Sequence, residues 1–159
     1  MTPPPTTATA TVHSPCTGQA LPLSECVDDV FSQQLVGPGV LIDPAPGRQT
    51  AVAPLDGTVV ALHPHAFVVL GEGGGVLVHL GIDTVRLEGA GFDVHVTKGD
   101  AVAAGDPVVT WDPDSLPDLV GEHRISRQVP VVLMERPADS LDLGELPRAV
   151  AVGDPLFTT

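Results

Sequence analysis

The chain has 159 residues, enough for one domain with its own apolar core. Glycine and proline together make 34 of these residues, about twice their average share, which argues against a helix bundle. Seven basic against 20 acidic residues give a net charge of −13, which disfavours binding to nucleic acid or to an anionic membrane.

The first ten residues differ from the rest of the chain, because after Met1 they contain only proline, threonine and alanine. We expect a disordered tail over residues 1–10 and a single domain over residues 11–159. The N-terminus lacks the basic start and the apolar stretch of a signal peptide, and no apolar run reaches the roughly 20 residues that span a bilayer. These features predict a cytoplasmic protein without membrane insertion, in which Cys16 and Cys26 are reduced rather than bridged.

Short valine-rich runs, bounded by glycine, proline or aspartate, follow one another through the domain. This pattern is typical of strands and predicts an all-β fold, an antiparallel β-sandwich or barrel-like domain with one or two short helical segments. The helical segments are expected at residues 28–35 and 113–122, and residues 137–146 are ambiguous. The expected strands lie in residues 39–43, 57–63, 66–71, 75–83, 93–96, 100–112 and 128–134.

Three of the six histidines, His63, His65 and His79, fall within 17 positions of the chain. His65 and His79 flank the glycine-rich stretch at residues 71–75, which we interpret as a hairpin turn. In a hairpin centred on residue 72 these two histidines would lie directly opposite each other, with Cβ atoms roughly 5 Å apart. The same register would make residues 63 and 81 the next pair on that face.

Two neutral imidazoles on one apolar face can serve three kinds of chemistry. One ring can be a nucleophile with the other as hydrogen-bond donor, the pair can bind a metal ion, or the pair can act as general acid and base. Phosphoryl transfer suits the first role, because Nε2 is nucleophilic when a backbone carbonyl holds Nδ1–H. The chain has no GxxxxGK[ST] motif, which excludes a P-loop NTPase.

Long stretches of the sequence resemble the glucose-type IIA component of the bacterial phosphoenolpyruvate-dependent sugar phosphotransferase system. The most specific is the block H-x-G-I-D-T-V that begins at His79, and the resemblance covers about residues 11–159. The matching stretches are VAPLDGTVVAL (52–62), HAF (65–67), VLVHLGIDTVRLEGAGF (76–92) and VTKGDAVAAGDPVVTWD (96–112).

The resemblance implies a β-sandwich phosphocarrier with a shallow apolar active-site depression and no required cofactor. His79 matches the phosphorylated histidine, which bonds through Nε2, and His65 matches its neighbour. The implied partners are the phospho-histidine carrier protein HPr as donor, a cysteine of a IIB sugar-permease domain as acceptor, and regulatory target proteins. The residues that match the docking region are Asp28, Val30, Phe31, Val36, Phe67 and Asp83.

One position departs from the family. Where the family commonly has threonine, two positions before the auxiliary histidine, this chain has His63. The hydroxyl that would orient His65 is therefore absent, and whether His63 takes over its hydrogen bond is left open by the sequence.

Two alternative functions remain. His63, His65, His79 and Asp83 contain three histidines and a carboxylate, the ligand set of a zinc hydrolase, and His65 with His79 is a candidate for incidental zinc binding. The stretch around Lys98 resembles half of a biotinyl or lipoyl domain, which suggests a swinging-arm carrier, although the flanking signature is missing.

Overall fold

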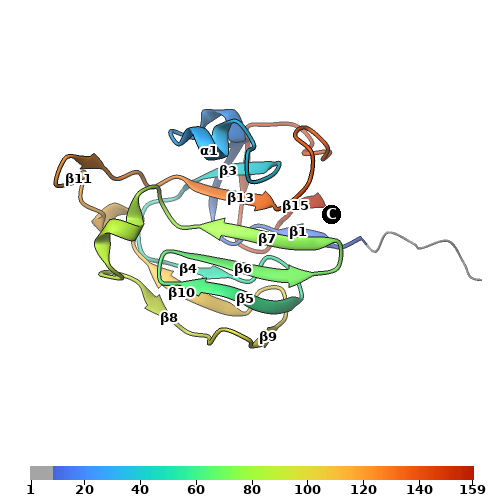
Figure 1. Cartoon of the computed structure of the whole chain (residues 1–159), viewed down its shortest axis with the longest axis horizontal. Helices are drawn as coiled ribbons and strands as arrows, with labels where there is room; N and C mark the ends of the chain where they lie inside the picture. Colours follow the sequence, from blue (N-terminus) through green and yellow to red (C-terminus); the bar gives the residue numbers. More distant parts are fainter. Residues whose placement is uncertain (1–8) are drawn as a thin grey trace, which may run out of the picture.

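The structure is a computed structural model that describes residues 9–159. Its regular secondary structure consists mainly of antiparallel strands. The largest sheet has eight strands, with β13 and β7 at its centre (Figure 1). In spatial order its strands are β14 (Arg148–Val150), β2 (Gly18–Pro22), β3 (Gly39–Pro44), β13 (Val129–Leu133), β7 (Gly74–His79), β6 (Ala66–Gly71), β5 (Gly57–His63) and β9 (Ala101–Val102).

Three smaller sheets complete the architecture, and the expected all-β sandwich or barrel-like fold is confirmed. One contains β4, β10 and β8, one pairs β1 with β15, and one is the β11–β12 hairpin. Their bounds are β1 (Thr11–His13), β4 (Gln49–Val52), β8 (Asp93–Val94), β10 (Pro107–Trp111), β11 (Leu119–Val120), β12 (His123–Arg124) and β15 (Pro155–Thr158).

The main core lies between the eight-stranded sheet and the three-stranded sheet. Val59 and Val78 from the larger sheet and Val109 and Trp111 from the smaller one are 0% exposed and belong to one apolar cluster. Burial of each such side chain contributes about 1.5–3 kcal/mol, which explains why so many short valine runs can form one stable domain.

Helical structure is confined to short segments, as expected. These are η1 (Leu23–Glu25), α1 (Asp29–Ser32), η2 (Thr84–Leu87) and η3 (Pro113–Ser115). The helix expected at residues 28–35 is confirmed as α1, and the Asp28 carboxylate caps it by accepting a hydrogen bond of 2.8 Å from the Val30 N–H.

The helix expected at residues 113–122 is wrong in its extent. The chain makes one turn of 3₁₀ helix at η3 and then continues into β11 and β12. Pro117 explains the early end, because proline disfavours helical backbone in the residue before it. The ambiguous residues 137–146 contain no helix or strand.

The N-terminal region is only partly described. Residues 1–8 of the expected tail lie outside the described residues, whereas Ala10 exchanges hydrogen bonds with Thr159 beside the β1–β15 pair. Cys16 and Cys26 are both buried and unbridged, in line with the expectation from the sequence. No helix within residues 9–159 is long and apolar enough to cross a membrane.

The register of the β6–β7 hairpin differs by one residue from the expected one. His79 pairs with Ala66 rather than His65, because both strands continue to Gly71 and Gly74 and only two residues form the turn. Gly73 adopts a φ of 87°, a left-handed conformation that such a tight turn requires. The expected pairing of residues 63 and 81 is also wrong, since His63 pairs with Ala66 across the β5–β6 turn.

Candidate functional site

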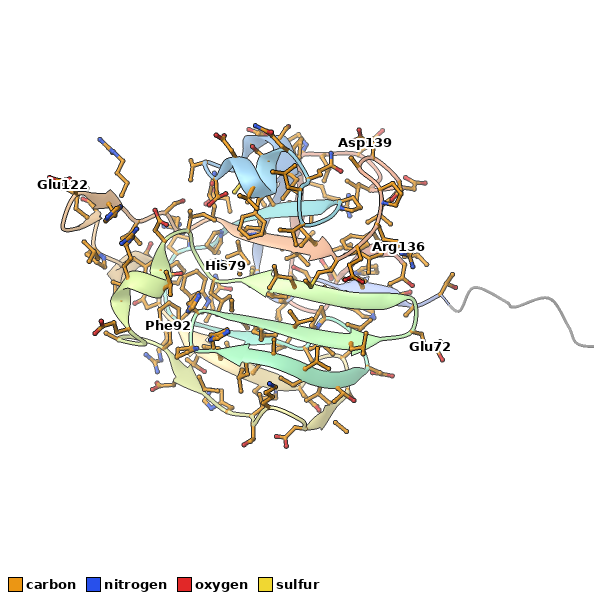
Figure 2. The ribbon with its side chains drawn as sticks, in the orientation of Figure 1. Glu72, His79, Phe92, Glu122, Arg136 and Asp139 are labelled. Carbon is orange, nitrogen blue, oxygen red and sulfur yellow. The ribbon has the colours of Figure 1, made fainter. Side chains whose placement is uncertain are left out.

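His79 is the last residue of β7, and the strand's alternation places it on the outer face of the sheet (Figure 2). Val76 and Val78 are 0% exposed and point into the core, so Leu77 and His79, which alternate with them, face outward. Nδ1–H of His79 donates a hydrogen bond of 2.5 Å to the carbonyl oxygen of Gly81. Nε2 makes no hydrogen bond within the described residues, so its lone pair is free to attack an electrophile.

The backbone around Gly81 is held rigidly in place. Ile82 exchanges two hydrogen bonds with Ser126, at 2.8 and 3.2 Å, and the buried Thr84 hydroxyl donates to the Leu80 carbonyl at 2.7 Å. Gly81 itself has a φ of 82°, and a Cβ at this position would lie 2.7 Å from the Ser126 carbonyl oxygen. The acceptor for His79 is therefore fixed by a segment that has no room for a side chain at residue 81.

His65 lies beside His79 although the two are not cross-strand partners. It occupies the turn between β5 and β6, where its side chain is free from the alternation of a strand. The two ring centroids are 5.2 Å apart and the planes are inclined at 68°. The carbonyl oxygen of His65 accepts a hydrogen bond of 2.7 Å from the Leu80 N–H, which ties the turn to the end of β7.

Both histidines are neutral at pH 7. Burial, followed by the nearby His79 and His63, lowers the pKa of His65 from 6.5 to about 4. Burial also lowers the pKa of His79, while the bond to Gly81 and the charges of Asp28 and Asp83 oppose that shift. A neutral imidazole with Nδ1–H fixed is the nucleophilic form, so the site holds its reactive state without needing an external base.

The predicted docking residues divide into exposed and buried ones. Val30 is 46% exposed and Val36 is half-buried. Asp28 and Asp83 are also half-buried, and their charges act on His79. Phe67 is 1% exposed and packs inside the main core, so its expected place on the docking surface is wrong. Its neighbours Ala66 and Val68 are also buried, so this part of β6 offers no exposed side chain for docking.

Phe31 also differs from the expectation, since it is only 7% exposed. Its ring centroid lies 5.5 Å from that of His79, and its side chain packs into a second small core below α1 with Leu41 and Val132. Phe31 therefore forms the apolar wall of the histidine site rather than an open contact surface.

Some features of the site were missed by sequence reasoning. The hydrogen bond from His79 to the Gly81 carbonyl could not be predicted from the sequence, which shows only a glycine two positions after the histidine. Three exposed apolar side chains also lie in segments beside the site, namely Val27 at 66%, Leu35 at 70% and Val85 at 56% exposure. The sequence could have indicated them, because they lie close in sequence to Asp28 or Asp83.

The zinc-hydrolase alternative lacks a ligand set. Within residues 9–159 no group of three or more histidine, cysteine, aspartate or glutamate side chains is arranged to hold a metal ion. His63 stacks on His65, with ring centroids 5.7 Å apart and planes inclined at 30°, and His79 contacts His65 by a second ring pair. The ring of His65 thus lies between the rings of His63 and His79 and contacts both.

The fold and the paired neutral histidines match a defined class of protein. Residues 10–138 match the model of the family described as "phosphoenolpyruvate-dependent sugar phosphotransferase system, EIIA 1". The chain belongs to this family, and it is a phosphocarrier component of a sugar phosphotransferase system.

A solved structure supports the same assignment in more detail. The chain is similar to the glucose permease IIA from Mycoplasma capricolum, with 32% sequence identity and a TM-score of 0.81. The match covers 94% of this chain and 95% of that one, so nearly the whole chain has a counterpart in a IIA protein.

Proposed function

We propose that this protein is a cytoplasmic phosphocarrier that accepts a phosphoryl group from phospho-HPr on Nε2 of His79 and passes it to a cysteine of a IIB sugar-permease domain. The observation that carries the proposal is the hydrogen bond from Nδ1–H of His79 to the Gly81 carbonyl. This bond selects the tautomer whose lone pair is on Nε2, beside the ring of His65.

The first step is an in-line displacement at phosphorus. Nε2 of His79 forms the new N–P bond while the N–P bond to the donor's histidine breaks, and the donor imidazole leaves with the bonding electrons. Negative charge is spread over the phosphoryl oxygens in the transition state, and an N–H of His65 stabilises it. In the second step a thiolate of the IIB domain attacks the same phosphorus, and the imidazole of His79 is the leaving group.

Docking is supported by charge and by exposed apolar surface. Val30 is exposed on α1, the helix whose Phe31 packs against His79, and Val36 packs against the same small core as Phe31. Asp28 and Asp83 place negative charge near His79. The net charge of −13 raises the rate of encounter with a partner that carries basic residues around its own active site.

The test is phosphoenolpyruvate-dependent labelling of the purified chain with enzyme I and HPr, read by intact mass and acid lability. The parent protein should gain one acid-labile phosphate, His79→Gln should gain none, and the matched control His123→Gln, exposed on β12, should be labelled like the parent. His65→Gln should accept phosphate but transfer it poorly to the IIB domain.

Absence of labelling in the parent, with enzyme I and HPr shown to be active on another acceptor, would overturn the proposed function. Labelling of His79→Gln would reject His79 as the nucleophile. Equal losses at acceptance and donation in His65→Gln would contradict the role assigned to that residue.

A further inference from the structure

The orientation of His65 is set by ring packing, because its side chain makes no hydrogen bond within residues 9–159. The imidazole is half-buried and lies between two other imidazoles. His79 meets it with the planes at 68°, and His63 stacks on it with the planes at only 30°. In the proposed function the N–H of His65 points at a phosphoryl oxygen, so its direction depends on contacts with the rings of His63 and His79.

His63 is well placed to act on His65 because the turn between them is tightly constrained. His63 ends β5 and pairs with Ala66, the first residue of β6, so Pro64 and His65 alone form the turn. Proline fixes its own φ and restricts the residue before it to extended backbone, which holds His63 in the strand conformation. Both histidine side chains therefore project from a turn with little freedom.

We propose that His63 is a positioning residue for the phosphoryl transfer, which acts by stacking its ring on His65 and keeping the N–H of His65 directed toward the phosphoryl group on His79. This inference rests on the proposed function and adds a third histidine to it. The nearby His63 also contributes to the low pKa of His65, which keeps that ring neutral.

The chemistry explains why stacking matters most for donation. Acceptance needs the lone pair of His79, which the Gly81 carbonyl prepares without help from residue 63. Donation needs the charge on the departing phosphoryl group to be held while the N–P bond breaks, and that depends on the direction of the His65 N–H. Loss of the His63 ring should therefore slow donation more than acceptance.

Two substitutions separate stacking from the other properties of His63. His63→Ala removes the ring, whereas His63→Phe keeps a flat ring and removes both nitrogens. We expect the rate of donation to the IIB domain to fall about tenfold in His63→Ala. A well-placed proton donor contributes roughly a hundredfold or more, and loss of the stacked ring should remove only part of the contribution of His65. Acceptance from phospho-HPr should change less than twofold, and His63→Phe should restore most of the donation rate.

A second readout does not depend on transfer at all. The ring of His65, followed by ¹⁵N-edited NMR during a pH titration, should show a higher pKa in His63→Ala, because the ring loses cover and a neighbouring histidine. His123→Ala serves as the control, since His123 is exposed on β12 and is not one of the three rings that contact one another.

The possible outcomes distinguish this inference from the proposed function. Parent-like donation by His63→Ala, failure of His63→Phe to restore the rate, or an unchanged His65 titration would each overturn the positioning role. If the parent itself is not labelled, the proposed function fails, while the NMR titration still reports whether His63 controls the ring of His65. Reduced donation with an intact melting temperature, rescued by Phe, supports the inference.

Discussion

Substitution of Gly81 by alanine tests the link between the backbone and the nucleophile. At a φ of 82° an alanine is strained by about 1–2 kcal/mol. Its Cβ would also lie 2.5 Å from Thr84 Cγ2 and 2.7 Å from the Ser126 carbonyl oxygen, so one of these neighbours must move. Such overpacking costs typically about 1–3 kcal/mol.

The expected result is a loss of about 3 kcal/mol in the free energy of unfolding, or roughly 6–12 °C in Tm for a chain of this size. The same displacement moves the Gly81 carbonyl away from Nδ1–H of His79. The favoured tautomer is then less populated, and labelling by phospho-HPr should slow by about tenfold to a hundredfold, as expected for a misplaced reacting group.

Gly91 supplies the matched control. It has a similar φ of 86°, but a Cβ there would meet nothing within 4 Å. Gly91→Ala should therefore cost only the backbone strain, about 1–2 kcal/mol, and leave labelling unchanged. Thermal unfolding and the labelling rate of both variants are the measurements. If Gly81→Ala is as stable and as quickly labelled as Gly91→Ala, the argument that this glycine holds the nucleophile is refuted.

Three further predictions follow from burial and from the shifted pKa values. The pKa of His65 is 6.5 in the unfolded chain and about 4 in the folded one, so between these pH values the unfolded chain binds more protons. The Tm should therefore fall as the pH drops from 6.5 to 4, and it should fall less in His65→Gln. Phe67→Ala should lower the free energy of unfolding by about 3–5 kcal/mol, because Phe67 is buried in the core. Val30→Asp should leave Tm unchanged and weaken HPr binding in titration calorimetry, because Val30 is exposed. If Phe67→Ala instead kept its Tm and lost HPr binding, Phe67 would belong to the interface. Burial raises the pKa of the Cys16 thiol to about 12 and also raises that of Cys26, so neither should react with iodoacetamide at pH 8 until urea unfolds the chain, and rapid labelling of the native protein would contradict this.

Much of the fold was predictable because it depends on local patterns. Valine-rich runs between glycine, proline and aspartate identify strands through their spacing alone, and the strands expected at residues 39–43, 57–63, 66–71 and 128–134 are present. The run expected as one strand at 100–112 is instead two strands, β9 and β10, in different sheets, and the strand expected at 75–83 ends at His79. Strands such as β1, β2, β4 and β14 lie outside the expected valine-rich runs. Their identity depends on pairing partners that are distant in sequence, which local patterns do not contain.

The candidate site shows the same division. His65 and His79 were identifiable from the motif H-x-G-I-D-T-V and from their places on either side of a glycine-rich turn. Their proposed register was wrong by one residue, because two residues rather than a longer loop form the turn. The rings meet nevertheless, since His65 lies in a turn where strand alternation no longer sets the direction of the side chain.

The class of fold, the family and the two central histidines could be predicted from the sequence, because they follow from residue types and their spacing along the chain. Three features were evident only in the folded protein: Phe67 lies in the core, the Gly81 carbonyl accepts the hydrogen bond from Nδ1–H of His79, and His63 stacks on His65. Burial, tautomer and ring packing depend on the neighbours that folding brings around each group. Those neighbours come from several strands and turns, so only the folded chain defines them.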